Sequence, residues 1–222
     1  MTYYTKYLKY KNKYLDLKYY SGNMVGGTTD VEYIIQNKNY YASVLRVTND
    51  IKKIITEIFS FTVKPTILKI KNSYIIEVYI ENLIKAMLDA QVVLNKIYLD
   101  TFYSFGMHSM NITSGYLAMT TLYKIITYPN LKSIELSNIK FDPGDNLNLN
   151  QFTEKSNITE LIIKMTTITD QQILQLIEMC PNLVSITIPQ DIYLIPSAGS
   201  TPISEQLKQI IPNVKLTINE SK

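Results

Sequence analysis

Only a few side chains in this sequence of 222 residues are of the types that carry out catalysis. The single histidine, His108, has one acidic residue within ten positions, Asp100, and the single cysteine, Cys180, has no basic neighbour. A zinc site or a catalytic dyad needs several such groups that converge, and a reactive thiol needs positive charge beside it. We therefore expect His108 in a loop or on the surface, Cys180 packed and inert, and no catalytic site, metal or cofactor.

Two glycine-containing segments are the candidates for holding a phosphate or a cation. Gly26-Gly27 lacks the Lys-Ser/Thr pair of a phosphate-binding loop, and the seven glycines contain no G-x-G-x-x-G pattern. Residues 141–145 have the composition of a tight turn, because proline and glycine suit its central positions. The acids of this turn, Asp142 and Asp145, lack the surrounding motif of a calcium loop. We expect a turn there and no ion site.

The composition is that of an ordinary folded domain. Hydrophobic residues make up 46% and charged residues 18% of the chain, unlike the weakly hydrophobic, highly charged composition of disordered proteins. A fold of this size removes roughly 70% of the unfolded surface from water. One cysteine rules out an internal disulfide, and the sequence shows neither a secretory signal nor a transmembrane segment. We expect one domain in an intracellular compartment.

Positive charge is confined to the beginning of the chain. Residues 1–20 hold five lysines and one aspartate, whereas the remainder holds 17 basic and 18 acidic residues. A nucleic-acid-binding domain would show a broad basic surface on its folded body. We therefore expect no nucleic acid on the body of this protein.

Residues 1–20 also differ in composition, with seven tyrosines. Tyr3, Tyr7, Tyr10 and Tyr14 recur at spacings of three and four, which predicts a basic amphipathic helix. Residues 21–30 are rich in glycine and threonine and predict a linker, followed by a domain over residues 31–222.

The Tyr/Lys pattern of residues 7–18, followed by a Gly-Gly pair, resembles a leader found on many otherwise unrelated proteins of mimivirus-like giant viruses. The resemblance implies a viral origin and delivery to the virion or to the viral factory. One alternative is a helix that caps the domain or packs on its side. Attachment to an anionic membrane surface is less favoured, because it needs a more apolar face than tyrosine supplies.

From about residue 40 onward a short pattern recurs, and its clearest copy spans residues 168–188. Thr169 or Asp170 can cap a helix there, Pro181 can end it, and Ile186 and Ile188 alternate as in a strand with one buried face. The apolar face of this helix comprises Ile173, Leu176, Ile177 and Cys180.

Further copies of the pattern predict the architecture. One ends at residue 136 with a helix one turn longer, another ends at residue 218, and more strands are predicted at 156–163 and 93–99 with fainter ones at 43–47 and 66–70. The strand landmarks are Leu45, Leu68, Ile97, Ile134, Leu161, Ile186 and Leu216, at separations of 23, 29, 37, 27, 25 and 30 residues. Strands joined through helices lie parallel, since an antiparallel neighbour needs only a hairpin. The sequence thus predicts an α/β solenoid with a parallel sheet on its concave face and helices on its convex face.

The run Ile-Thr-Asp, helix, Cys-Pro-Asn-Leu, x-x-Ile-x-Ile at residues 168–188 resembles the cysteine-containing leucine-rich repeat of F-box/leucine-rich-repeat substrate receptors. The copies ending at 136 and 218 keep Pro-Asn but replace the cysteine with Tyr128 and Ile211. The resemblance implies a leucine-rich-repeat-like solenoid in which Cys180 is an inward structural residue. Residues 28–65 show no F-box pattern, so a role as a ubiquitin-ligase adaptor stays only an alternative.

The strand positions between the buried ones predict a binding surface. In a leucine-rich-repeat stack they face the concave side, and five strands make a surface roughly 20 Å long. We expect this surface to bind a protein partner of unknown identity. The predicted binding residues are Tyr98, Asp100, Ser133, Glu135, Ser137, Glu160, Ile162, Lys164, Ser185 and Thr187, with Lys96, Lys215 and Thr217 on the same side. The alternatives are a surface that is merely solvated, a structural or virion-associated protein, and an α/β enzyme.

Overall fold

The computed structural model describes residues 30–36, 44–71, 77–100, 117–142, 144–145, 154–164, 166–189 and 201–219. The chain divides into two compact units, Met1–Val31 and Glu32–Lys222, and the fold below is that of the second. The predicted helix at residues 1–20 and most of the predicted linker lie outside the described residues, as does His108.

The second unit alternates strands and helices along the chain. The strands are β1 (Glu32–Gln36), β2 (Ile67–Lys71), β3 (Lys96–Asp100), β4 (Ser133–Ser137), β5 (Glu160–Lys164), β6 (Ser185–Pro189) and β7 (Lys215–Asn219). The helices are α2 (Val44–Ser60), α3 (Glu77–Asp89), α4 (Met119–Ile126), α5 (Asp170–Met179) and α6 (Ile203–Ile210).

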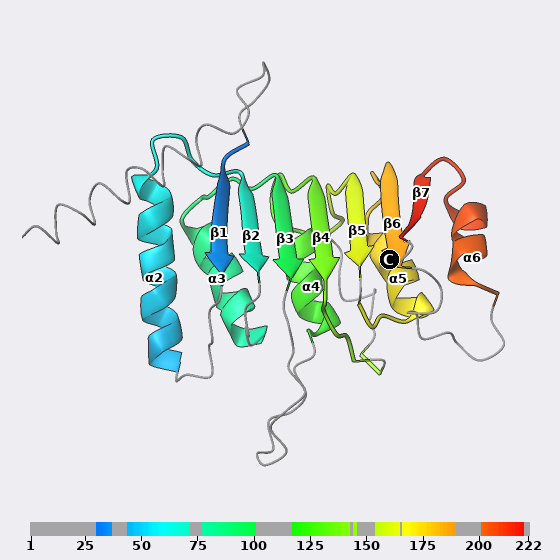
Figure 1. Cartoon of the computed structure of the whole chain (residues 1–222), viewed down its shortest axis with the longest axis horizontal. Coiled ribbons are helices and arrows are strands. Elements are labelled where there is room, and N and C mark those ends of the chain that lie inside the picture. Colours follow the sequence, from blue (N-terminus) through cyan, green and yellow to red (C-terminus); the bar gives the residue numbers. More distant parts are fainter. Residues whose placement is uncertain are drawn as a thin grey trace, which may run out of the picture. The chain divides into compact units, whose positions relative to one another are not determined.

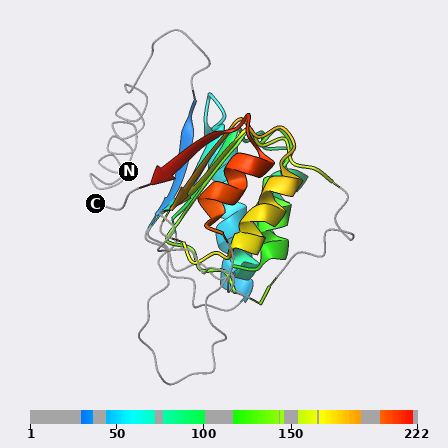
Figure 2. The ribbon, with the colours of Figure 1, turned by 90° about the vertical axis from the view of Figure 1, so that its right-hand side faces the viewer.

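All seven strands form one parallel sheet, and their order in the sheet is their order in the chain (Figure 1). The five helices lie on one side of this sheet (Figure 2). Among the described residues, no segment lies across the other side. The predicted α/β class with a parallel sheet is therefore confirmed.

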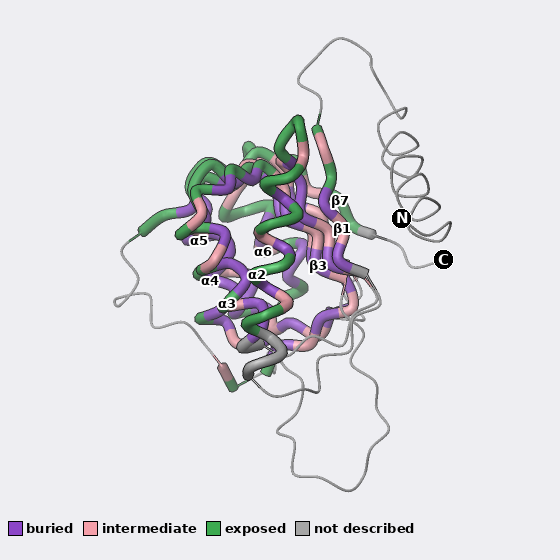
Figure 3. The backbone as a smooth tube through the Cα atoms, turned by 90° about the vertical axis from the view of Figure 1, so that its left-hand side faces the viewer, coloured by how far each residue is buried: buried purple, intermediate pink, exposed green. Residues whose placement is uncertain are grey.

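The core lies between the sheet and the helices, where buried residues concentrate (Figure 3). Six of the seven predicted landmarks occupy one row across the sheet, because each is paired in register with the next. That row begins at β1 with Tyr33 and continues through Leu68, Ile97, Ile134, Leu161, Ile186 and Leu216. Since strand side chains alternate between faces, this register turns each strand's apolar positions toward the helices together.

One predicted strand is wrong. The landmark Leu45 lies in helix α2, not in a strand, and the first strand is β1, about ten residues earlier. The helix forms because Ile51, Ile54 and Ile58 recur at helical spacing and are all buried. In β1 the alternation of apolar and polar residues is obscured. Its two buried residues are separated by Ile34, which points outward but is also apolar.

The starts of the strands are linked by a recurring backbone hydrogen-bond pattern. In each link, the carbonyl oxygen of the residue just before one strand accepts hydrogen bonds from N–H groups at the start of the next strand. The accepting carbonyls are those of Thr66, Asn95, Lys132, Thr159 and Val184, with N···O distances of 2.7–3.2 Å. These bonds satisfy backbone groups at the end of the sheet where the strands begin, and they hold neighbouring strands in one register.

The three Pro-Asn copies form the same turn between a helix and the following strand. The carbonyl oxygens of Tyr128, Cys180 and Ile211 each accept a hydrogen bond from the N–H three residues later, at 3.0–3.2 Å. Cys180 and Tyr128 are buried and Ile211 is partly buried, so one position accepts three different apolar side chains. The expectation that Cys180 is packed is confirmed.

The helix caps agree only in part with the sequence. Helix α5 begins after Thr169, whose hydroxyl accepts from the Gln172 N–H while the Gln172 side chain accepts from the Thr169 N–H, and it ends before Pro181. The helix of the copy that ends at residue 136 was expected to be one turn longer than α5. It is shorter instead, with eight residues against ten, because α4 begins only at Met119.

Helix α4 takes its N-terminal cap from a distant turn. The residue before it, Ala118, has no side chain that could accept a hydrogen bond. Asp145 replaces it, because its Oδ2 atom accepts from the Met119 N–H at 2.7 Å. The Gln172 side chain donates to the carbonyl oxygens of Asp142 and Asp145, each at 2.7 Å. The predicted turn thus joins α4 to α5, and its acids have structural partners.

No described helix is long and apolar enough to cross a membrane.

Replacing Asp145 with alanine removes the cap of α4 and should lower the free energy of unfolding by about 1 kcal/mol. Urea unfolding followed by circular dichroism measures this loss. Asp89→Ala is the control, because Asp89 is exposed and its ionic partner among the described residues is Lys85 one turn away, and it should cost about 0.3–0.5 kcal/mol or less. Equal losses in the two variants would contradict the capping role.

Candidate functional site

The side of the sheet that faces away from the helices is the candidate site, and we call it the open face. It comprises the first, third and fifth residue of each strand, since the second and fourth are buried in β1 to β6 and the same register continues into β7. All ten predicted binding residues occupy such positions. Ser133 and Ser137 are nonetheless buried, so they contribute little surface that a partner could reach.

The register brings the predicted residues together in three rows across the sheet. The first row holds Ser133, Glu160 and Ser185, the second holds Tyr98, Glu135, Ile162 and Thr187, and the third holds Asp100, Ser137 and Lys164. Residues far apart in sequence thus become neighbours on one rigid layer.

The charges of the first row of the open face alternate in sign on every second strand. In the first row Glu32 on β1, Lys96 on β3, Glu160 on β5 and Lys215 on β7 follow one another, with an uncharged residue on each strand between them. In the second row Lys69 on β2 is followed by Glu135 on β4. Within these two rows opposite charges lie two strands apart, and charges of different rows can meet between adjacent strands.

Several of these charges pair across the sheet. Lys164 Nζ lies 2.7 Å from Oε1 of Glu135, which is only 14% exposed, and Lys69 closely contacts Glu32. Lys96 lies farther from its acids, at 4.0 Å from Glu135 and 3.8 Å from Glu160. Pairs that water reaches contribute about 0–1 kcal/mol each. Their main effect is to fix the positions of the charged groups on the open face.

Tyr98 is the aromatic side chain near the middle of these charges. Its hydroxyl donates to Asp100 Oδ2 at 3.3 Å, and Asn138 donates to the other oxygen of Asp100 at 2.7 Å. The ammonium group of Lys71 lies 5.4 Å from the centre of the Tyr98 ring, a cation–π distance. Burial, followed by the charges of Asp100 and Glu135, raises the pKa of the Tyr98 phenol to about 12. The phenol therefore stays protonated and can donate at neutral pH.

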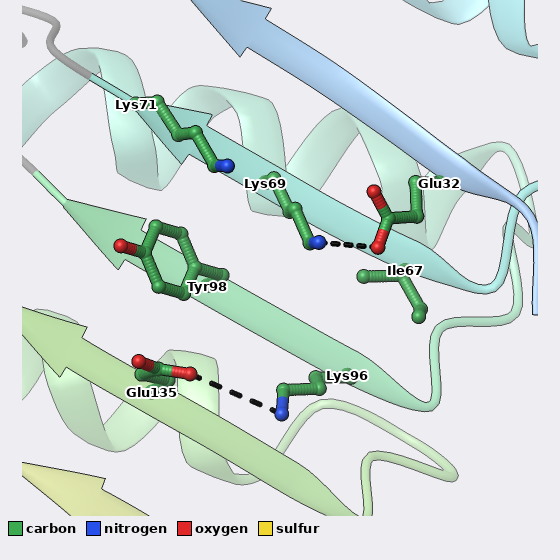
Figure 4. Close-up of a pocket in the computed structure, with 7 residues that line it drawn as sticks. All are labelled: Glu32, Ile67, Lys69, Lys71, Lys96, Tyr98 and Glu135. Carbon is green, nitrogen blue, oxygen red and sulfur yellow. Dashed lines mark ion pairs between the residues drawn. The ribbon is translucent and has the colours of Figure 1, made fainter. Parts of the chain in front are cut away.

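A small hollow of about 230 Å³ opens beside Tyr98, over the strands β1 to β4 (Figure 4). It is lined by Glu32, Ile67, Lys69, Lys71, Lys96, Tyr98 and Glu135. Tyr98 and Glu135 were predicted from the sequence as binding residues, whereas the contributions of β1 and β2 were not predicted. The predicted strand at residues 66–70 pointed to Lys69, whereas nothing in the pattern placed Glu32 beside it.

The residues considered for chemistry do not form a reactive centre in the described part of the chain. Burial raises the pKa of the Cys180 thiol to about 11, which opposes formation of the nucleophilic thiolate. Asp142 and Asp145 serve the turn beside α4. The described residues contain no group of three or more His, Cys, Asp or Glu side chains that could hold a metal ion.

No protein-family model matches this chain, and no curated protein sequence matches it significantly.

Because Cys180 is buried and its pKa is raised to about 11, we expect a water-soluble maleimide to label the native protein very slowly at neutral pH. In guanidinium chloride the same thiol should be labelled completely. The Cys180→Ala variant is the control for side reactions, since Cys180 is the only cysteine of the chain. Equal labelling rates for folded and unfolded protein would show that the thiol is accessible.

Proposed function

We propose that this protein is a non-enzymatic, leucine-rich-repeat-like interaction module that binds a protein partner through the open face of its sheet. The observation that carries the proposal is the combination on one side of the sheet of apolar and aromatic side chains with charges of which several are paired. Tyr98 and Ile162 lie in the second row, and ion pairs lie around them. Large side chains surrounded by polar groups are typical of the central residues of protein interfaces.

The dimensions of the open face favour a peptide or a narrow edge of a domain as the partner. Seven strands about 4.8 Å apart, each of five residues, give an area of roughly 29 Å by 16 Å. A standard interface between two proteins buries about 800 Å² on each partner. The flat area of the open face is smaller, and an extended segment laid across the strands would use it most fully.

The parallel strands in chain order support a solenoid in which the sheet forms the concave side, as do the recurring bonds between strand starts. Residues 1–20 keep their predicted role as an address or a capping helix, and a giant-virus origin with delivery to the virion or viral factory stays part of this proposal. The predicted intracellular compartment stays a prediction as well.

The test is affinity purification from the native cellular context with the intact chain and with a variant whose open face is blocked. Ile162→Arg combined with Thr187→Arg places two bulky charges in the second row without touching the core. A matched control changes the exposed helix residues Lys53→Glu and Lys85→Glu. We expect partners to be retained by the intact chain and the control and reduced at least tenfold with the blocked variant. The same partners on all three proteins would refute binding at the open face.

A further inference from the structure

Lys96 stands out on the open face because its charge is poorly satisfied. Its ammonium group carries three hydrogen-bond donors, and its side chain is only 29% exposed. Within the described residues its acidic neighbours are Glu135 at 4.0 Å and Glu160 at 3.8 Å, both beyond hydrogen-bond distance. Glu135 is engaged instead by Lys164 at 2.7 Å, and Glu160 accepts from the Ser133 hydroxyl at 2.6 Å.

Lys96 shares the hollow with two other lysines, Lys69 and Lys71. Figure 4 shows the side chains of Lys69 and Lys96 reaching into the hollow from neighbouring strands, with Ile67 and Tyr98 beside them. The carboxylates of Glu32 and Glu135 line the same hollow, each beside its own lysine. Figure 4 labels no acidic side chain between the ammonium groups of Lys69 and Lys96.

We propose that the hollow is a subsite for one acidic side chain, a glutamate or aspartate of the bound partner segment. Its carboxylate accepts hydrogen bonds from Lys96 and Lys69, and its methylene groups lie against Ile67 and the ring of Tyr98. Charge-assisted hydrogen bonds of this kind are about twice as strong as neutral ones. This inference rests on the proposed function and names the chemistry of the partner at one position.

The size and charge of the hollow favour a single side chain over other anions. Its volume of about 230 Å³ lies below the roughly 300–1,000 Å³ of small-molecule sites. Its lining has three lysines against Glu32 and Glu135, a net charge of +1, and Glu160 lies 3.8 Å from Lys96 beside this lining. A single negative charge is therefore the most that the hollow can balance. A nucleic-acid backbone, which carries many negative charges, would meet, after residue 20, a chain with 17 basic and 18 acidic residues.

The experiment titrates the full chain with N-acetyl-glutamate N-methylamide and follows the NMR signals of the Tyr98 ring and the lysine side chains. We expect saturable shifts at Tyr98, Lys69 and Lys96 with a dissociation constant in the millimolar range. N-acetyl-glutamine N-methylamide, which has the same shape without the charge, should bind at least about fivefold more weakly. Equal shifts with the two compounds, or no saturable shift, would overturn the proposal.

Variants assign the effect to the hollow. Lys96→Gln and, separately, Lys69→Gln should weaken binding of the glutamate compound about fivefold or more, whereas Lys96→Arg should retain most of it. Lys85→Gln, on the exposed surface of α3, should leave binding unchanged. Circular dichroism verifies that each variant is folded. Unchanged binding in both hollow variants would refute the subsite, as would tighter binding of inorganic phosphate than of the glutamate compound.

The outcome is independent of the test of the open face. If the glutamate compound fails to bind while Ile162→Arg with Thr187→Arg still abolishes partner capture, only the acidic subsite is wrong. If the compound binds but the blocked variant captures the same partners, the open face is not the docking surface.

Discussion

The fold depends on apolar side chains that lie side by side on neighbouring strands. Each of the two inward positions of a strand forms a row across the sheet, such as Leu68, Ile97, Ile134, Leu161 and Ile186, and every member of this row is buried. Full burial of such a side chain stabilises the fold by about 1.5–3 kcal/mol. No single strand could achieve this burial, because its apolar side chains are shielded by the strands on either side and by the helices.

The same rows determine what the opposite side of the sheet presents. With a side-chain period of two, a shift of one residue would move every apolar side chain out of the core. The register that buries Ile134 and Leu136 therefore also fixes Glu135 between Tyr98 and Ile162 on the open face. The candidate site is in this sense a consequence of the core, and the backbone bonds between strand starts reinforce it.

Much of this arrangement could be predicted from the sequence because it depends on local periodicity. The alternation in β6 and the Pro-Asn turns identified β4, β6 and β7 with their facing residues, and the need for helical connections predicted parallel strands. Leu45 was misassigned because a short apolar run fits a strand as well as a helix, and only the spacing of Ile51, Ile54 and Ile58 further along reveals α2.

What could not be predicted depends on contacts between residues far apart in the chain. The cap that Asp145 supplies to Met119 spans 26 residues and has no local signature. The hollow joins Glu32, Lys69 and Lys96 from three strands, so it required both the recognition of β1 and the distances between side chains. Lys96 on β3 and Lys164 on β5 both lie on strands next to β4, which carries Glu135. Only the side-chain positions show that Lys164 is the closer partner of Glu135.

The central claim is that one side of the sheet is buried and the other is free to meet a partner in the intact chain. Single cysteines placed at Tyr98, Ile162 and Thr187, and at their inward neighbours Leu99, Ile163 and Ile186, test it directly in a Cys180→Ala background. We expect rapid maleimide labelling at the first three positions and labelling at least a hundredfold slower at the other three. Slow labelling at all six positions would show that another part of the chain covers the open face, and rapid labelling at all six would contradict the buried rows.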